Sequence, residues 1–204
     1  MKKKAMTSHS IKRELDVLKR KSILLEARQQ FYEYGYEPTS LESIAEALGV
    51  SRQFIYSRFS NKTELLVELC RVGASAADMA VAYAETLRDG PRERLASFIS
   101  YFVTLQIENQ IEVALYFRES NSLPKDVAEE MDRSKLGFHK ALSRILIEGK
   151  DAGLFQFEDT GVTASAIGGM ASWAFFWFQP AGPFPPQTVA DQIAKIALSS
   201  VHGT

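Results

Sequence analysis

The chain has very little cysteine, and this scarcity excludes stabilisation by internal disulfides. Its 204 residues include one cysteine, Cys70, which has no partner in the same chain. The sequence therefore suits a reducing compartment, and we expect a cytoplasmic protein. Cys70 lies in an apolar stretch, which favours a buried packing role over redox sensing. The basic start of the chain is not followed by an apolar run, so no signal peptide is expected.

Motifs for catalysis and metal binding are also missing. The three histidines, His9, His139 and His202, are not spaced like metal ligands. No nucleophile elbow, P-loop or dinucleotide-binding glycine pattern occurs. The sequence therefore predicts a protein that is not an enzyme and that uses neither a metal nor a cofactor. For His139, which adjoins an apolar helix face, a plain helical position is favoured over a ligand contact.

Strand-like alternation of apolar and polar residues is absent over any useful length, which excludes an extensive sheet. Apolar residues recur instead at helical spacing, so the predicted fold class is all-α. The residues expected to face inward are Ile23, Ala27, Phe31 and Tyr34, then Leu95, Phe98, Phe102 and Leu105, then Val127, Met131, Phe138, Leu142 and Ile145. The expected helices, besides two short ones within 39–59, cover 19–34, 62–88, a segment from Pro91, 111–117, 124–152, 162–178 and a segment carrying 189–200.

Residues 39–65 begin with the pattern of a short helix and a tight turn. Thr39 and Glu42 are spaced as a capping box, in which each side chain would bond a free backbone N–H at the helix start. Gly49 follows the apolar positions of this helix and suits the left-handed residue that commonly ends one. The pattern predicts that the chain turns sharply at Gly49.

The following residues predict a second short helix and the start of a third. Ser51 is a suitable cap, and Ile55 and Phe59 form an apolar pair on one side of the second helix. Asn61 with Glu64 repeats the capping pattern for the next helix. Two short helices joined in this way are typical of a helix-turn-helix, whose second helix enters the DNA major groove.

The charge distribution fits DNA binding at this end of the chain. The chain as a whole is near neutral, with 24 basic and 25 acidic residues. Residues 47–63 nevertheless contain three basic residues and no acidic one, and the first 21 residues contain eight Lys or Arg against two acidic residues. Such a local excess is what phosphate binding requires. The basic residues at the very start also fit a solvated tail, so their contact with DNA stays open.

Residues 20–66 resemble the DNA-binding domain of the TetR/AcrR family of transcriptional regulators, with order and spacing that match without gaps. Three positions on or near the groove-facing surface depart from the common pattern: Gln53, Phe54 and Arg58. The operator sequence therefore does not carry over from the family. The matching residues are Ile23, Leu24, Ala27, Phe31, Gly35, Tyr36, Thr39, Ser40, Leu41, Ile44, Ala45, Gly49, Val50, Ser51, Ile55, Tyr56, Phe59, Asn61, Lys62 and Leu65.

The helix-turn-helix assigns candidate DNA contacts. Arginine reads guanine and glutamine reads adenine through paired hydrogen bonds, whereas helix N-termini and cations hold phosphates without reading sequence. For Tyr56, packing against the first helix is the alternative to DNA contact. The candidates for base and phosphate contact are Ser51, Arg52, Gln53 and Tyr56, and those for phosphate alone are Thr39, Arg58 and Lys62.

Residues 160–190 contain no charged residue, and their centre, residues 162–178, is apolar on every side. A transmembrane helix is one interpretation, but 17 residues are short for a bilayer and no basic residue flanks them. A fully buried helix explains the pattern better. A membrane-associated helical sensor remains the alternative outside the regulator class, and we expect no membrane partner.

Small and apolar positions in the last two long helices predict a dimer. Ala164, Gly168 and Ser172 form a line of small residues that allows close helix approach. The resemblance implies that these two helices build a four-helix bundle across a two-fold axis. The candidate interface residues are Gly168, Ser172, Val189, Ile193 and Ile196, with Ser200 on the same face.

Aromatic clusters in the second half of the chain fit either a core or a ligand pocket. Residues 173–182 are similar to a pattern in relatives that sense acyl-CoA, which would need cations such as Arg118, Lys135 or Lys140 at the pocket mouth. The alternative ligand is an uncharged or cationic lipophilic compound, as in efflux regulators. The candidate pocket residues are Phe98, Phe102, Tyr116, Phe117, Met131, Phe138, Met170, Trp173 and Trp177.

The combined prediction is a homodimeric repressor that binds a pseudo-palindromic double-stranded DNA operator and is released by a small, mainly hydrophobic effector. An activator built in the same way is the alternative. The expected organisation is a basic N-terminal arm at 1–18, a helix-turn-helix domain of three helices at 19–66, and a helical ligand-binding and dimerisation domain at 67–204.

Overall fold

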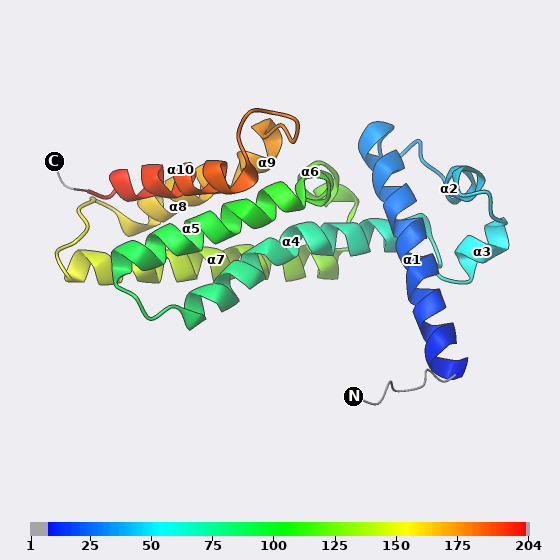
Figure 1. Cartoon of the computed structure of the whole chain (residues 1–204), viewed down its shortest axis with the longest axis horizontal. Helices are drawn as coiled ribbons and strands as arrows, with labels where there is room; N and C mark the ends of the chain where they lie inside the picture. Colours follow the sequence, from blue (N-terminus) through cyan, green and yellow to red (C-terminus); the bar gives the residue numbers. More distant parts are fainter. Residues whose placement is uncertain (1–7, 203–204) are drawn as a thin grey trace, which may run out of the picture. The chain divides into compact units, whose positions relative to one another are not determined.

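The computed structural model describes the backbone of residues 8–202 and the side chains of residues 12–202, and this part of the chain contains helices and no strand (Figure 1). The all-α fold class is thereby confirmed. Residues 1–7 of the predicted basic arm, and the side chain of His9, lie outside the described part. The helices are α1 (Ser8–Glu33), α2 (Leu41–Ala47), α3 (Arg52–Tyr56), α4 (Lys62–Thr86), α5 (Pro91–Glu108), α6 (Gln110–Glu119), the 3₁₀ turn η1 (Ser120–Ser122), α7 (Lys125–Asp151), α8 (Thr160–Ser172), α9 (Ala174–Trp177) and α10 (Pro186–Ser199).

The chain divides into two compact units, Met1–Leu69 and Cys70–Thr204, and the division falls within α4. The first unit contains α1, α2, α3 and the start of α4. Its core includes Ile23, Phe31, Ile44, Ile55 and Phe59, all fully buried. Because α2 and α3 are only 7 and 5 residues long, tertiary packing of these apolar residues must hold them in place.

Two predictions for the first helix need correction. The helix begins at Ser8, well before the expected start at Lys19. Tyr34, expected to face inward, is 68% exposed and lies beyond the last helical residue. Tyr36 is buried in its place and meets the ring of Phe31 edge-on, with centroids 5.2 Å apart.

The capping residue of α2 is Ser40, one position after the predicted Thr39. The Ser40 hydroxyl accepts a hydrogen bond from the Ser43 N–H, and the Ser43 hydroxyl accepts one from the Ser40 N–H. The predicted box of Thr39 and Glu42 is therefore wrong, although its logic holds one residue later. Gly49 ends α2 with a φ of 64°, as its left-handed position predicts.

The predicted caps of the next two helices are confirmed. The Ser51 hydroxyl accepts from the Phe54 N–H at 3.2 Å, at the start of α3. The Asn61 carboxamide oxygen accepts from the Glu64 N–H at 2.9 Å, at the start of α4. The Glu64 carboxylate also accepts from the Ser60 N–H, and this hydrogen bond lowers the pKa of Glu64.

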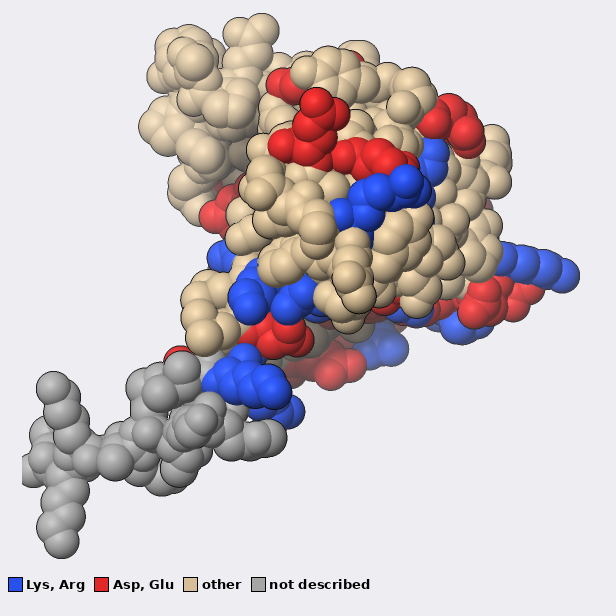
Figure 2. All heavy atoms as spheres, turned by 90° about the vertical axis from the view of Figure 1, so that its right-hand side faces the viewer, with Lys and Arg blue, Asp and Glu red and all other residues tan. Residues whose placement is uncertain are grey.

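Basic and acidic side chains are mixed on the surface near the helix-turn-helix. Figure 2 shows Lys and Arg interspersed with Asp and Glu on the face that is turned toward the viewer. Several of the basic groups have acidic partners within the first unit, as the ion pairs Arg20–Glu64, Arg52–Glu42 and Arg58–Asp16 show. The local excess of positive charge in the sequence is therefore partly neutralised in the folded unit.

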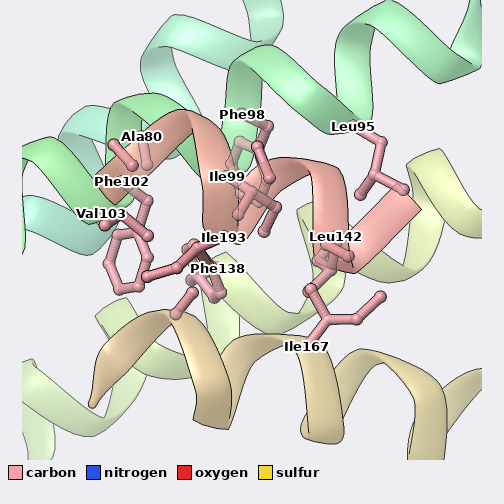
Figure 3. Packing of buried hydrophobic residues seen from close by; sticks show 14 of the residues in the cluster. Ala80, Leu95, Phe98, Ile99, Phe102, Val103, Phe138, Leu142, Ile167 and Ile193 are labelled. Carbon is pink, nitrogen blue, oxygen red and sulfur yellow. The ribbon is translucent and has the colours of Figure 1, made fainter. Parts of the chain in front are cut away.

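In the second unit, α5, α7, α8 and α10 surround one apolar core. Figure 3 shows Ile193 of α10 close to Phe98 and Phe102 of α5 and to Phe138 of α7. The rings of Phe102 and Phe138 lie 4.2 Å apart between centroids. The inward-facing residues predicted for α5 and α7 are confirmed as buried. Pro91 opens α5 as expected, since proline suits the first helical position.

The apolar segment predicted as one buried helix is divided and only partly buried. α8 ends at Ser172, and the short helix α9 begins at Ala174. Val162 and Phe176 are 70% and 67% exposed, so this segment keeps an apolar face on the surface of the second unit. No helix within residues 8–202 is both long enough and apolar enough to cross a membrane.

Candidate functional site

The helix α3, the second of the predicted helix-turn-helix, has a buried side and an exposed side. Ile55 is fully buried, and the Ser51 cap fixes the start of the helix. This anchoring leaves Arg52, Gln53 and Tyr56 exposed on the opposite side, together with Ser51 itself. Tyr56 is 48% exposed, so packing against α1 does not enclose its ring. These four positions form the accessible surface of α3.

Arg52 is held by an acidic side chain of the preceding helix. Its guanidinium donates to the carboxylate of Glu42, in the first turn of α2. The pKa of Glu42 is lowered by a hydrogen bond from its own backbone N–H and further by the charge of Arg52. Because the pair is exposed, an incoming guanine or phosphate can exchange with Glu42 at small cost.

The three residues predicted to hold phosphates have other partners in this structure, and Thr39 is the clearest correction. Thr39 is 4% exposed, and its hydroxyl donates to the Gly35 carbonyl oxygen at 2.7 Å. It fastens the turn between α1 and α2 and does not project from a helix N-terminus. Ser40 takes the position at the start of α2 that Thr39 was expected to occupy.

Arg58 and Lys62 are also bound internally. The side chain of Arg58 is only 14% exposed and contacts Asp16 of α1 at 2.9 Å. The Lys62 ammonium donates to the carbonyl oxygens of Tyr36 and Glu37 at 2.8 and 3.0 Å. Phosphate contact would require Arg58 to give up its ion pair with the carboxylate of Asp16. The two carbonyl partners of Lys62, in contrast, carry no charge and do not neutralise its ammonium group.

A cavity of about 390 Å³ lies within the second unit, bordered by α4, α5, α6, α7 and α8. Small residues of α4 make room for it, including Gly73 and Ala77. The predicted pocket residues that line it are Phe102, Tyr116, Phe117, Met131 and Phe138. A largely apolar wall with few polar groups is the usual character of a small-molecule site.

The other predicted pocket residues lie elsewhere. Phe98 stacks on Phe138 at 4.9 Å in the core behind the cavity wall. Trp173 and Trp177 are 48% and 50% exposed and belong to an aromatic group on the surface, where Trp173 stacks on Phe176 at 4.8 Å. Met170 packs against the core. These four residues are not among those that line the cavity.

Several polar side chains border the cavity. Gln106 of α5 is 5% exposed, and its carboxamide oxygen has no hydrogen-bond partner among the described residues. Lys135 of α7 lies 4.9 Å from the centroid of the Tyr116 ring. His139 and Ser165 form a hydrogen bond of 3.3 Å. His139 thus borders the cavity, where a helical residue could also contact a ligand.

The candidate dimer residues divide between the inside and the outside of the subunit. Gly168 and Ser172 border the cavity, and a Cβ atom on Gly168 would lie 3.5 Å from Phe138. Val189 and Ile193 are buried in the subunit core. These four assignments are corrected, because the line of small residues admits α7 of the same chain. Ile196 is 46% exposed.

Comparison with known families agrees with this architecture. Residues 23–69 match the model described as bacterial regulatory proteins of the tetR family, and residues 88–201 match the tetracyclin repressor-like C-terminal domain. The second match alone spans more than half of the chain. The chain belongs to the TetR family. Regulators of this family are transcription factors without enzymatic activity, and this TetR-family chain is a DNA-binding transcriptional repressor.

Similar proteins extend over most of this TetR-family chain. The transcriptional repressor KstR2 of Mycobacterium tuberculosis is 27% identical over 190 residues, which cover 89% of this chain and 92% of KstR2. The crystal structure of the TetR-family regulator PfmR from Thermus thermophilus has a TM-score of 0.78 and 29% identity, and covers 87% of this chain and 97% of PfmR. The structure of AibR in complex with isovaleryl coenzyme A and operator DNA has a TM-score of 0.71 at 24% identity, covers 90% and 97% of the two chains, and shows a shared fold.

Sequence reasoning missed a buried polar residue in the cavity wall, Gln106. Gln106 occupies a core position of α5, four residues after Phe102 and in register with Leu95 and Ile99. A polar side chain at a buried helical position needs a hydrogen-bond partner. That mismatch was visible in the sequence and was the available signal for the unpartnered polar group in the cavity wall.

Proposed function

We propose that this TetR-family repressor binds its operator as a homodimer and is released when a small, mainly apolar compound enters the cavity of the second unit. The observation that supports this most is the cavity of about 390 Å³ with aromatic walls and one buried amide side chain. Its volume lies within the usual range for ligand sites. In a family whose members bind operator DNA and small effectors, such a cavity is the natural site for the effector.

DNA contact is assigned to the exposed side of α3. Arg52 and Gln53 lie in its first turn, from which side chains of a recognition helix reach base edges. Ser51 and Tyr56 flank them and are suited to phosphate or base contact. We assign Lys62 to the phosphate backbone through its charge. Thr39, which is buried, and Arg58, which is paired with Asp16, are not assigned to DNA.

The helix α4 is the proposed connection between ligand and DNA. It begins at Lys62, directly after the helix-turn-helix, and its residues Gly73, Ala74 and Ala77 border the cavity. A Cβ atom on Gly73 would lie 2.6 Å from the Glu112 carbonyl oxygen of α6, so these two helices cross closely. A ligand that favours a different packing of α4 would shift the population away from the state that binds DNA.

The charges near the cavity favour a ligand with little or no charge over a coenzyme A thioester. AibR binds isovaleryl coenzyme A, whose head group is polyanionic and needs several cations. Of the three candidate cations, only Lys135 borders the cavity. Arg118 contacts Glu119 at 3.0 Å, and Lys140 borders a different hollow, beside Arg144.

The release mechanism is tested with the purified full-length protein. A preferred duplex is first selected from random DNA and is then used in fluorescence anisotropy with fatty acids, their coenzyme A thioesters and lipophilic cations. We expect a compact apolar compound to release the duplex and Gly168→Leu, which narrows the cavity, to abolish that release. If no apolar compound acts while a polar metabolite does, the proposal is wrong.

Dimer formation is assigned to the exposed apolar face of α8 and α10. Val162 and Ile196 are exposed apolar residues on these helices, and Gly169 has open space beside its Cα. A second copy of the chain would cover this uncharged face. Sedimentation of Val162→Lys and Ile196→Lys should show a weakened dimer, whereas Leu136→Lys, an equivalent change on α7, should leave it intact. Equal behaviour of all three variants would contradict the assignment.

A further inference from the structure

The inner part of the cavity presents a hydrogen-bonding group that the protein leaves unsatisfied. Gln106 is 5% exposed, and its Oε1 has no hydrogen-bond partner among the described residues. Around it, the cavity wall is apolar and includes Phe102, Val113 and Phe138. A buried amide oxygen without a donor is costly, so a ligand that supplies one gains affinity at this point.

The rim of the cavity carries a cation. The side chain of Lys135 is 56% exposed, and its ammonium contacts Asp132 at 3.2 Å. Partial burial opposes the charge, but interactions with Tyr116 and Asp132 outweigh this effect and raise the pKa of Lys135, so the side chain stays cationic. An ammonium group carries three donors, and Asp132 accepts one of them. A further acceptor on a ligand can therefore join this group.

From this arrangement we propose that the ligand is a linear amphipathic acid with a carboxylate at one end and a hydroxyl group at the other. The carboxylate contacts Lys135 at the rim, the chain lies along the aromatic wall, and the hydroxyl group contacts Gln106. A hydroxyl group both donates to Oε1 and accepts from Nε2, so it suits the two atoms of the amide. This inference rests on the proposed function, because it identifies the chemistry of the same effector site.

The size of the cavity limits the length of the chain. At about 30 Å³ for each water-sized unit of liquid volume, a cavity of about 390 Å³ holds roughly a dozen non-hydrogen atoms. An ω-hydroxy acid of medium length has this size. A long-chain acid would fit only if part of its chain remained outside the cavity.

Calorimetric titration of the full-length protein tests the two ends of the ligand separately. The probes are ω-hydroxydecanoic acid, decanoic acid, decanediol and decanoyl coenzyme A, which share one chain length. We expect ω-hydroxydecanoic acid to bind most tightly, and loss of either polar end to weaken binding about tenfold. Decanoyl coenzyme A should bind weakly, because one lysine does not balance its head group.

Two variants assign each preference to its residue. Gln106→Met should remove the advantage of the hydroxyl group and leave decanoic acid bound as well as before or better. Lys135→Met should remove the advantage of the carboxylate and leave decanediol unaffected. Lys125→Met, on the same helix and 92% exposed, and Gln29→Met, on the exposed surface of α1, are the matched controls and should change nothing.

The possible results separate this inference from the proposed function. If the two acids bind equally well to the unmodified protein, or if none of the four probes binds, the inference is overturned, whatever the variants do. If other apolar compounds still release the selected duplex and Gly168→Leu prevents this release, the proposed function stands although the inference about the hydroxy acid fails. If Gly168→Leu has no effect on release by any compound, the effector site itself is wrong.

Discussion

Arg58 of the helix-turn-helix and Asp16 of α1 form an ion pair of 2.9 Å that joins two segments far apart in the sequence. The same guanidinium lies 4.3 Å from the centroid of the Phe54 ring and donates to the Phe54 carbonyl oxygen at 3.0 Å. Phe54 belongs to the recognition helix α3. Arg58 thus connects the recognition helix to the N-terminal part of α1, which begins earlier than the sequence predicted.

This connection predicts a measurable coupling between Asp16 and Arg58. Asp16→Asn should lower the free energy of unfolding by less than about 1 kcal/mol, because the carboxylate is exposed. Arg58→Met should cost about 2 kcal/mol, since it also removes the contact with Phe54 and a backbone hydrogen bond. Urea unfolding of both single variants and the double variant would give the pairwise energy. Strictly additive losses would show that the ion pair contributes nothing.

Base reading should depend on Gln53. Its exposed position in the first turn of α3 suits paired hydrogen bonds to adenine. Gln53→Ala should reduce discrimination at one or two operator positions by about 1–3 kcal/mol each. Selection from random duplexes measures this, with Gln29→Ala on the exposed surface of α1 as the control. If the preferred sequence and its affinity advantage over other sequences are both unchanged, Gln53 does not read bases.

The local patterns of the first unit were largely predictable because each depends on a few neighbouring residues. The positive φ of Gly49 and the caps at Ser51 and Asn61 follow from the sequence alone. Thr39 and Ser40 were confused because both carry a hydroxyl group suited to a cap, and only packing decides which one is buried. Arg58 was assigned to phosphate because its partner, Asp16, is remote in sequence.

In the second unit, the sequence pattern of one helix could not predict how that helix packs. α8 is apolar or small on every side, so its sequence does not indicate which face turns inward. Gly168 was therefore placed at a dimer contact, although it lies beside Phe138 of the same subunit. Of the predicted residues that border the cavity, Phe102, Tyr116 and Phe117 were found from aromatic clusters, and Met131 and Phe138 from the apolar spacing of α7. Gln106 required attention to a polar residue in a buried register.

The buried thiol of Cys70 predicts a specific dependence of stability on pH. Desolvation, with a smaller effect of the charge on Glu119, raises the pKa of Cys70 from its ordinary value of 9.0 to about 12. The folded protein thus keeps this proton at a pH where the unfolded chain loses it. Its contribution to stability is complete below pH 9.0 and declines as the pH rises from 9.0 toward 12.

Cys70→Ala should remove this component of the alkaline decline. Between pH 9.0 and 12, the free energy of unfolding of the unmodified protein should fall by up to about 1.4 kcal/mol more per pH unit than that of the variant. Comparing slopes, rather than absolute stabilities, cancels the cost of the small void left by the substitution. Urea unfolding at several alkaline pH values measures both slopes, and identical slopes would contradict the raised pKa. Slow reaction of the native thiol with a disulfide reagent is a second check.

Substitutions at two neighbouring glycines of α8 should separate ligand binding from dimer formation most clearly. Gly168 borders the cavity beside Phe138, whereas a Cβ atom on Gly169 would meet nothing within 4 Å. Leucine at either position gains a similar helix propensity, roughly 1 kcal/mol over glycine, so this effect cancels between the variants. Gly168→Leu should fill part of the cavity and overpack Phe138, at a cost of about 1–3 kcal/mol.

We therefore expect opposite results from the two substitutions. Gly168→Leu should abolish ligand binding in calorimetry while the protein still sediments as a dimer. Gly169→Leu should keep ligand binding and weaken the dimer, because its side chain projects from the exposed face that a second subunit is proposed to cover. If Gly168→Leu dissociates the dimer and retains the ligand, the inner face of α8 contacts a second subunit, and the assignment of the cavity wall is wrong.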